Sequence, residues 1–367
     1  MTAPTPTPAA SRPTARPPLG LAGMLVLVAL VEVAIGACRA DLAPPWAEDW
    51  RFARWAAEHR APGADVLCFG DSLVKYGVLP RAIEAGAGLK AYNLATSGGT
   101  MPSAFFLLQR ALDAGARPRA VVVDVAALML ADAGAAGQHN YPELATVADC
   151  AGLARARGDA DLLAALLLAK ALPSVAWRFE LRGLVVASLA GRSGSQRAAG
   201  TEHRRRWETH RGAQPMPLGR ARHPREDYLV DGVSPADWAI DPTDGLYLDR
   251  FLALAASQGV PVAWLIPPLG PEVHARRAMR GSDAAYDRFV RDRLARFPGV
   301  VVLDARRSGY DDSVHVDHIH LDRDGARILS ADIADALAAR PGAADRWVDL
   351  PPLGGRAALA SRGATVR

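Results

Sequence analysis

A serine, a histidine and an aspartate stand at positions from which they could act together. Ser72 comes two residues after the uncharged run Val66–Gly70, so it falls on the turn that ends a predicted strand. Asp317 and His320 lie three residues apart, shortly before a predicted C-terminal helix. That spacing lets a carboxylate bind the far imidazole nitrogen and fix its tautomer, while the near nitrogen faces a nucleophile. A serine hydroxyl needs such a base because it holds its own proton tightly at neutral pH. The sequence therefore predicts a catalytic triad of Ser72, His320 and Asp317.

Simpler interpretations exist for each of these residues. Ser72 alone suits the N-cap of a helix, and Asp71 is expected to accept hydrogen bonds within the turn rather than to act as a catalytic acid. Asp317 and His320 could belong to an ordinary turn. The triad is the favoured interpretation because two motifs that lie far apart in the sequence together supply all three groups that the chemistry requires.

A metal site is the alternative use of the same C-terminal segment. Four potential ligands fall within six residues, namely His315, Asp317, His318 and His320. No cysteine cluster or partner carboxylate accompanies them, and alternation along the chain points some of them away from the others. We therefore favour the triad, and we predict neither a metal nor an organic cofactor.

Strands and helices alternate along most of the chain. Strands are expected at residues 65–69, 89–93, 120–126, 260–266 and 300–303, and helices at residues 101–114, 282–297 and 322–339. A further helix is expected after Asp241, which suits an N-cap because Pro242 follows it. Strands that are apolar on both faces and alternate with helices indicate an α/β fold with a parallel sheet covered on two sides. In such a sheet Ser72 and His320 would meet at the carboxyl edge, where ligands bind.

The N-terminus predicts contact with a membrane. Residues 1–18 are rich in Pro, Thr and Ala and are expected to be a disordered leader. Residues 19–37 are apolar apart from Glu32, and as a helix they would span roughly 28 Å, close to the hydrocarbon thickness of a bilayer. Residues 19–38 are therefore a signal anchor or transmembrane helix, or a secretory signal. Lipidation of Cys38 after cleavage is a third interpretation, which Glu32 disfavours. We expect the rest of the chain outside the cytoplasm.

The remaining chain divides into a linker, a large domain and a tail. Residues 39–63 are expected to form a linker with a juxtamembrane helix. Its tryptophans suit either the membrane interface or packing on the domain; they are Trp46, Trp50 and Trp55. Residues 64–340 form the predicted domain, and residues 341–367 the tail. Residues 133–240 interrupt the domain pattern as a helical and loop insertion. Within it we expect helices at 161–170 and 177–189, and a solvated arginine-rich loop at 191–225.

Composition narrows the possible partners. The net charge is only +4 over 367 residues, and the basic residues are spread along the chain, so nucleic-acid binding is not predicted. Three cysteines, Cys38, Cys68 and Cys150, do not suggest a disulfide scaffold, although a Cys68–Cys150 pair is open on sequence grounds.

Three short motifs together resemble the SGNH/GDSL hydrolase family. They are Gly70-Asp71-Ser72, Asn93 with Ser97-Gly98, and Asp317-x-x-His320-Leu321. The resemblance covers residues 64–132 and 241–339, and it implies a three-layer α/β/α domain that acts as a serine esterase or O-acyltransferase. By the same resemblance Ser72 is the nucleophile, His320 the base and Asp317 its orienting partner. The implied oxyanion hole uses the backbone N–H groups of Ser72 and Gly98, or of Gly99 if the alignment shifts by one residue.

One motif of that family is missing. Its members usually carry Gly-x-Asn-Asp after the third strand, and the asparagine side chain is a third oxyanion donor. Here the corresponding segment ends at Leu128, whose side chain cannot donate a hydrogen bond. Losing one such donor typically costs about 10²–10³ in rate. Gln138 and Asn140, in the next loop, are the candidate replacements.

Two hypotheses for the function follow. Some membrane-anchored members of this superfamily lack the same motif and act on acyl groups of cell-envelope polysaccharides. The first hypothesis is therefore a membrane-anchored, extracytoplasmic esterase or O-acyltransferase whose substrate is an acyl ester, with an acylated polysaccharide as the candidate. The alternative is a non-catalytic envelope protein that binds glycan or partners a membrane acyltransferase.

Overall fold

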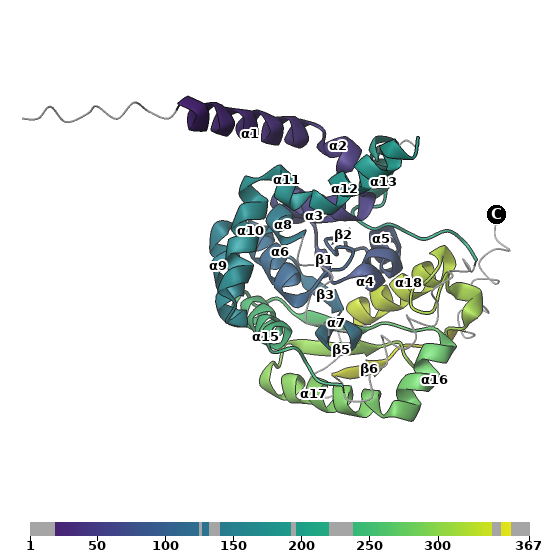
Figure 1. Cartoon of the computed structure of the whole chain (residues 1–367). Coiled ribbons are helices and arrows are strands. Elements are labelled where there is room, and N and C mark those ends of the chain that lie inside the picture. Colours follow the sequence, from purple (N-terminus) through teal and green to yellow (C-terminus); the bar gives the residue numbers. More distant parts are fainter. Residues whose placement is uncertain are drawn as a thin grey trace, which may run out of the picture.

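The domain is built on a parallel β-sheet. A computed structural model describes residues 19–124, 127–131, 140–191, 196–219, 238–339 and 346–353. Within them a six-stranded sheet has the order β2-β1-β3-β4-β5-β6, and every neighbouring pair is parallel (Figure 1). The strands are β1 (Val66–Phe69), β2 (Ala91–Asn93), β3 (Ala120–Asp124), β4 (Val262–Ile266), β5 (Val300–Asp304) and β6 (Trp347–Asp349). The predicted α/β class with a parallel sheet is confirmed.

Helices cover both faces of the sheet. Alternate strand residues point to opposite sides, so Leu67 and Phe69 of β1 join one apolar cluster while Val66 and Cys68 join another. The first cluster is completed by α3 (Pro45–His59), α6 (Met101–Asp113), α15 (Pro242–Ser257) and α17 (Ser282–Arg296). The second is completed by α4 (Ser72–Gly77), α5 (Pro80–Ala87) and α18 (Arg323–Ala339).

The predicted helices and strands are found with small changes at their ends. Asp241 caps α15 as expected, because its Oδ1 accepts hydrogen bonds from the N–H groups of Thr243 and Asp244 at 2.8 and 3.1 Å. Strand β6 lies within the segment that we predicted as a tail. Three residues at the edge of a sheet are too few to give a recognisable apolar alternation. The remaining short elements are η1 (Ala61–Gly63), α7 (Ala127–Ala131), α16 (Pro271–Arg280) and η3 (Asp312–Val314).

The N-terminal helix α1 (Leu19–Ala37) is long and apolar enough to cross a membrane, by length and composition. A signal sequence would pass the same test. The window Gly20–Ala37 is not buried inside the protein, and Figure 1 shows α1 projecting along one side of the domain. The short helix α2 (Arg39–Leu42) follows it.

The predicted linker is part of the folded domain. Helix α3 occupies residues 45–59, and Trp50 within it is fully buried and donates a hydrogen bond from Nε1 to the Ser97 carbonyl oxygen at 3.0 Å. Trp46 and Trp55 are 40% and 42% exposed. Packing on the domain is therefore the correct interpretation for Trp50, because its position faces the apolar cluster rather than the outside.

The insertion is helical. It contains α8 (Tyr141–Leu144), α9 (Val147–Arg157), α10 (Ala160–Ala171), α11 (Pro173–Ala176), α12 (Arg178–Leu189) and α13 (Arg197–Thr209). The helices predicted at 161–170 and 177–189 are confirmed, whereas the loop predicted at 191–225 is wrong over α13. Trp207 is buried and gives α13 an inner face. The outer face carries ion pairs at helical spacing, such as Arg204–Glu208 at 3.0 Å.

The three cysteines are free thiols, so the Cys68–Cys150 disulfide that the sequence left open is not formed. Cys38 is exposed, whereas Cys68 and Cys150 are buried. Burial raises the pKa of the Cys68 thiol to about 12, which keeps it protonated and consistent with a packing role.

Candidate active site

Ser72 is held at the carboxyl end of β1 by a turn that requires glycine. Gly70 has a φ of +145°, and a Cβ there would lie 2.8 Å from Val74 Cγ2 and 2.9 Å from the Cβ of Asp124. Asp71 caps α4, because its Oδ1 accepts the Leu73 N–H at 2.8 Å. The expected structural role of Asp71 is confirmed. Ser72 is thus the first residue of α4 rather than its cap, and its side chain is free to face the carboxyl edge of the sheet.

The loop before α18 fixes Asp317 against His320. Asp317 Oδ1 accepts the backbone N–H groups of Ile319 and His320 at 2.9 and 2.8 Å. Its other oxygen, Oδ2, lies 2.8 Å from His320 Nδ1. A bridge between His315 and Leu321 closes the loop. The three-residue spacing therefore forms a tight turn in which one carboxylate holds both the backbone and the imidazole.

These two segments meet. His320 Nε2 lies 2.8 Å from Ser72 Oγ, across 248 positions of sequence. The His320 and Asp317 side chains are 15% and 16% exposed, so they are shielded from bulk water yet open to a ligand. The Tyr76 ring packs edge-on against the imidazole, with centroids 5.2 Å apart. The hydrogen-bond chain from serine to histidine to aspartate has the geometry that base-assisted nucleophilic attack requires.

The electrostatics favour an ionised aspartate beside the histidine. Burial alone would raise the pKa of Asp317. The hydrogen bond and charge of His320, with the two backbone N–H groups, outweigh that effect and lower the pKa to about 2. An ionised Asp317 fixes the proton of a neutral His320 on Nδ1 and leaves Nε2 as the acceptor for the Ser72 proton.

The Ser97-Gly98 loop, residues 94–100, is joined to the Ser72 turn. The Leu94 N–H donates to the Cys68 carbonyl at 2.7 Å, and the Thr96 N–H donates to the Gly70 carbonyl at 3.1 Å. Gly99 packs closely, since a Cβ there would lie 2.4 Å from the Gly70 oxygen. The loop and the turn are therefore held in register by the backbone itself.

The structure distinguishes between the two adjacent glycines. The Gly99 N–H donates to the Thr96 carbonyl at 2.9 Å and is already engaged. Gly98 is exposed at the tip of the turn with a φ of +65°. Among the described residues, the N–H groups of Ser72 and Gly98 make no hydrogen bond. Gly98, not Gly99, thus has the N–H that is available to a ligand.

Asn93 stabilises the same region without facing the triad. Its Nδ2 donates to the carbonyl oxygens of Val74 and Val78, both at 2.9 Å, and its Oδ1 accepts the Ala95 N–H at 2.9 Å. The side chain is fully buried. Asn93 therefore connects α4 to the Ser97-Gly98 loop.

The third oxyanion position falls largely outside the described residues. Gln138 and the side chain of Leu128 belong to that undescribed part. Asn140 is described: it is buried just before α8, and no hydrogen bond links it to Ser72 or Gly98 among the residues that the structure covers. Asp124 is fully buried at the end of β3, beside Gly70.

A buried network that the sequence did not predict lies behind the Ser97-Gly98 loop. We call it the Asp49 network; its members are Asp49, Lys75, Tyr76, Ser97 and His203. Asp49 Oδ1 lies 3.0 Å from Lys75 Nζ and 2.7 Å from His203 Nε2, and its Oδ2 accepts the Ser97 hydroxyl at 2.7 Å. The Tyr76 hydroxyl lies 3.0 Å from Ser97 Oγ. The network therefore connects the loop that carries Gly98 to the tyrosine that packs on His320.

The central ion pair of this network has no access to solvent. The side chains of Asp49 and Lys75 are both 0% exposed. Burial alone would raise the pKa of Asp49, but Lys75, His203 and the Ser97 hydroxyl together lower it below its usual value. Breaking a buried pair leaves an uncompensated charge, so each member depends on the others. No sequence pattern pointed to these contacts, and Ser97 was singled out only as part of the Ser97-Gly98 motif.

The remaining histidines of the C-terminal segment diverge. His315 Nδ1 lies 2.8 Å from the Asp311 carbonyl oxygen, and His318 Nδ1 lies 3.8 Å from a Glu272 carboxylate. In the part of the chain that the structure describes, no group of three or more His, Cys, Asp or Glu residues could hold a metal ion.

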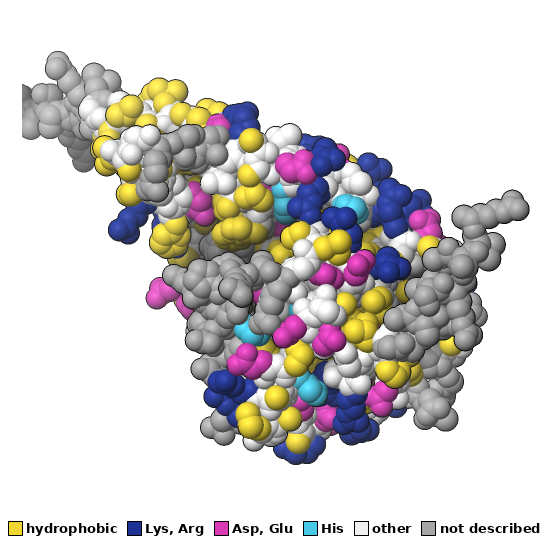
Figure 2. Space-filling model, turned by 90° about the vertical axis from the view of Figure 1, so that its right-hand side faces the viewer, with side chains coloured by type: hydrophobic (Ala, Val, Ile, Leu, Met, Phe, Trp, Pro, Cys, Tyr) yellow, Lys and Arg dark blue, Asp and Glu magenta, His cyan; other side chains and the backbone are white. Residues whose placement is uncertain are grey.

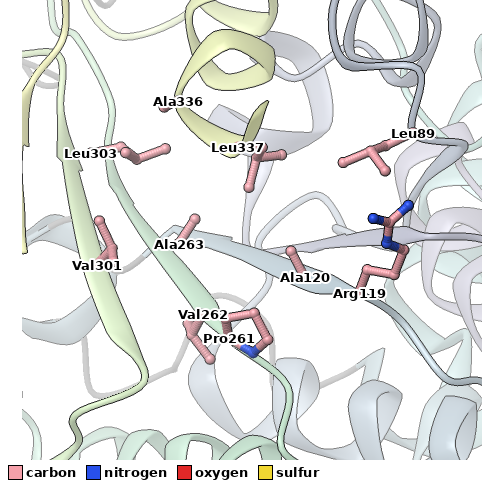
Figure 3. Close-up of a pocket in the computed structure, with 10 residues that line it drawn as sticks. All are labelled: Leu89, Arg119, Ala120, Pro261, Val262, Ala263, Val301, Leu303, Ala336 and Leu337. Carbon is pink, nitrogen blue, oxygen red and sulfur yellow. The ribbon is translucent and has the colours of Figure 1, made fainter. Parts of the chain in front are cut away.

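The cavity in Figure 3 lies elsewhere. It has a volume of about 360 Å³ and is lined mainly by apolar residues, with Leu89, Arg119 and Pro261 at the amino ends of β2, β3 and β4. Ser72 and His320 lie at the opposite edge of the sheet, so this cavity is separate from the candidate site.

No protein-family model matches the chain, and no curated protein matches its sequence. The assignment of a function therefore depends on the geometry of the site and on the three motifs.

Proposed function

We propose that the protein is a serine hydrolase or O-acyltransferase of the SGNH/GDSL type, acting on a carboxylic ester. The observation that carries the proposal is the chain of two 2.8 Å hydrogen bonds from Ser72 Oγ through His320 to Asp317. The sheet with helices on both faces supports the three-layer arrangement of that family. The order of the motifs along the chain supports it as well.

In the first half of the reaction, Ser72 Oγ attacks the carbonyl carbon of the ester. Its proton passes to His320 Nε2, and Asp317 stabilises the imidazolium that results. The N–H groups of Ser72 and Gly98 stabilise the negative oxygen of the tetrahedral intermediate. The carbon–oxygen bond to the alcohol then breaks as His320 returns the proton to the leaving oxygen, and an acyl-serine remains.

In the second half, His320 takes a proton from the acceptor, which then attacks the acyl-serine. Water as the acceptor gives a carboxylic acid, and a sugar hydroxyl gives a new ester. The tetrahedral intermediate collapses as His320 protonates Ser72 Oγ, which restores the enzyme. Hydrolysis and transfer therefore use the same three side chains, and the choice between them depends on which acceptor reaches the acyl-serine.

The place of action follows from α1. We propose that it anchors the protein in a membrane and that the domain lies outside the cytoplasm. Arginines lie on both sides of α1, so charge does not decide the orientation. The support is that α1, near the N-terminus, is the one helix of the described residues that is long and apolar enough to cross a membrane, as a signal anchor would be. An acylated cell-envelope polysaccharide is the proposed substrate, because its esters lie within reach of a membrane-anchored domain.

A non-catalytic envelope protein is the second candidate. The segment that ends at Leu128, in place of the usual asparagine, favours it, because an oxyanion hole with two donors instead of three is slower by about 10²–10³. Such a protein would bind glycan or a partner acyltransferase at the same edge of the sheet. The hydrogen bonds of Ser72, His320 and Asp317 favour catalysis, since glycan binding alone does not require that arrangement.

A fluorophosphonate probe separates the two candidates. It reacts covalently with an activated serine, so the wild-type protein should be labelled and Ser72→Ala should not. Ser257→Ala is the matched control, because Ser257 is an exposed serine at the end of α15 and bonds only a neighbouring carbonyl. Absence of labelling in the folded wild type, or equal labelling of Ser72→Ala, would overturn the proposed catalysis by Ser72.

A further inference from the structure

Helix α12 is apolar on both of its sides. Leu181 and Leu184 face inward and pack on a small cluster that contains Trp177 and Leu42. The outer side exposes further large apolar residues, namely Phe179 (63% exposed), Val185 (57%), Val186 (53%) and Leu189 (84%). A surface helix of a globular protein normally turns polar residues outward. A group of exposed apolar side chains on one helix marks an interaction surface.

This surface adjoins α1. Figure 1 shows α11 and α12 on the side of the domain that α1 follows, and Figure 2 shows hydrophobic side chains continuing from α1 onto the neighbouring surface. Ile35 of α1 packs on the same small cluster as Leu181 and Leu184. The apolar surface of α12 is thus continuous with the helix proposed to enter the membrane.

Glu32 fixes the position of α1 against the insertion. It is the one charged residue within α1, and its carboxylate accepts the Ser174 backbone N–H at 2.9 Å and the Ser174 hydroxyl. An ionisable residue inside a membrane-spanning helix faces protein and finds a polar partner there. Ser174, near the start of α11, is that partner, so α11 must lie at the depth of Glu32.

That depth suits the membrane interface. Glu32 lies five residues before Ala37, the last residue of α1, which corresponds to about 7.5 Å along the helix axis. Amphipathic interfacial helices lie about 5–10 Å into the boundary between headgroups and acyl chains. If α1 spans the membrane, α11 and the start of α12 therefore lie where the headgroups meet the acyl chains.

Basic and aromatic residues flank the apolar surface. The Arg178 guanidinium lies 4.5 Å from the centre of the Phe179 ring, and the Arg39 guanidinium lies 4.9 Å from that of Trp177. Arg182 is exposed on α12 as well. Arginine and tryptophan favour the headgroup level, where the apolar part of the side chain is buried and the polar part stays hydrated. Arg39 is paired with Glu48 and Glu143, so the exposed Arg178 and Arg182 are the charges that favour anionic lipids.

We propose that α11 and α12 form a second membrane attachment, with the outer side of α12 in the interface of a bilayer that contains anionic phospholipid. The proposal rests on the anchoring role proposed for α1 and is independent of the chemistry at Ser72. Two attachments, one spanning and one interfacial, hold the domain in a fixed orientation to the membrane, which a single helix does not achieve.

Site-specific fluorescence in vesicles tests the proposal on the full chain. The background is Cys38→Ser, because Cys38 is the exposed thiol and the other two cysteines are buried. An environment-sensitive thiol dye is placed at Val186→Cys on α12, at Val28→Cys on α1, and at Met279→Cys on α16 as the exposed control. Each protein is reconstituted into phosphatidylcholine–phosphatidylglycerol vesicles. Quenching is measured with iodide and with phospholipids that carry a spin label at a shallow or a deep position. Thermal unfolding verifies that each variant is folded.

We expect the dye at position 186 to be quenched by the shallow lipid label several-fold more than the dye at 279, and to be protected from iodide. The dye at 28 should respond to the deep label. If the dye at position 28 is quenched by the deep lipid label but the dye at 186 is quenched by iodide as strongly as the dye at 279, the proposal for α12 is overturned. The proposal that α1 is a membrane anchor is then kept. Protection from iodide without quenching by lipid at 186 would indicate a protein partner or a second copy, and would also overturn it. Fluorophosphonate labelling of Ser72 is unaffected by either outcome, so a failure here is distinct from a failure of the proposed catalysis.

Discussion

The triad and the Asp49 network are neighbours in space, joined through Tyr76, but they differ in how far the sequence predicts them. Ser72, Asp317 and His320 come from two short motifs, and the ends of parallel strands bring these motifs together across 248 positions. The Asp49 network collects single residues from α3, α4, α13 and the Ser97-Gly98 loop, and the contact from Asp49 to His203 crosses 154 positions. The groups that would react are marked locally in the sequence, whereas the groups that hold them in place are not.

This difference has an energetic side. The triad exposes polar atoms to a ligand, and the turn between Asp317 and His320 is stabilised by its own backbone hydrogen bonds. The central pair of the Asp49 network has no such access, because Asp49 and Lys75 are completely buried and depend on each other for charge compensation. Substitutions in the triad should therefore reduce activity more than stability. Substitutions in the network should reduce both.

The largest effect is expected from His320→Ala. Without a base, Ser72 keeps its proton, and hydrolysis of a small activated ester such as p-nitrophenyl acetate should fall by about 10⁴-fold or more. The melting temperature should change little, because the imidazole is partly exposed and its backbone bonds to Asp317 remain. The matched control is His59→Ala, an exposed histidine on α3 that bonds only the Trp55 carbonyl. A fall of less than tenfold in His320→Ala would show that the triad does not carry the reaction.

An intermediate effect, on the free energy of unfolding, is expected when Asp317 is protonated at low pH. Its pKa in the folded protein is about 2, below the ordinary value of 3.8, so folding favours the ionised form. The associated stability is fully present above the ordinary pKa and is lost as the pH falls through about 2. The free energy of unfolding should therefore drop by about 2 kcal/mol more in the wild type than in Asp317→Asn between pH 5 and pH 2. Urea unfolding of both proteins across this range measures it. Parallel curves for the two proteins would contradict the proposed ionisation.

The smallest effect is expected from Ser97→Ala. The change removes the hydroxyl that Asp49 Oδ2 accepts and that contacts Tyr76, but it leaves the Trp50 bond to the Ser97 carbonyl intact. An unsatisfied buried carboxylate oxygen should lower the free energy of unfolding by about 1–3 kcal/mol. If the network positions Gly98, kcat should fall by about tenfold with KM nearly unchanged, since the lost interaction acts in the transition state.

Measuring both the free energy of unfolding and kcat of Ser97→Ala decides the role of Ser97. Loss of stability with unchanged kcat would mean that the network only supports the fold and does not position the loop. Ser257→Ala again serves as the control, because its hydroxyl lies on the surface of α15 and should affect neither quantity.

Much of the architecture was accessible from the sequence. The first five strands, the capped start of α15 and the meeting of Ser72 with His320 follow from apolar runs, N-cap chemistry and the rule that strand ends share one edge of a parallel sheet. These are local patterns combined with one rule of topology. The resemblance to SGNH/GDSL hydrolases predicted the same three residues and stays a proposal at the level of function.

The rest required three-dimensional contacts. The many arginines of α13 led to the prediction of a solvated loop. The burial of Trp207 and the hydrogen bond between His203 and Asp49 explain why this segment is a packed helix. The choice between Gly98 and Gly99 could not be made from two adjacent glycines. It depends on which N–H is engaged by Thr96 and on a 2.4 Å approach to the Gly70 oxygen.

The packing of α3 in the domain also limits the distance between the candidate site and α1. Residues 38–44 are all that separates the end of α1 from the start of α3. Even fully extended, they could cover at most about 25 Å. If α1 is a membrane anchor, this short connection therefore keeps the domain close to the membrane. If the proposed anchor and the proposed esterase activity both hold, the candidate site stays close to the bilayer. Its ester would then have to reach that zone on a polymer emerging from the membrane or on a carrier that resides there.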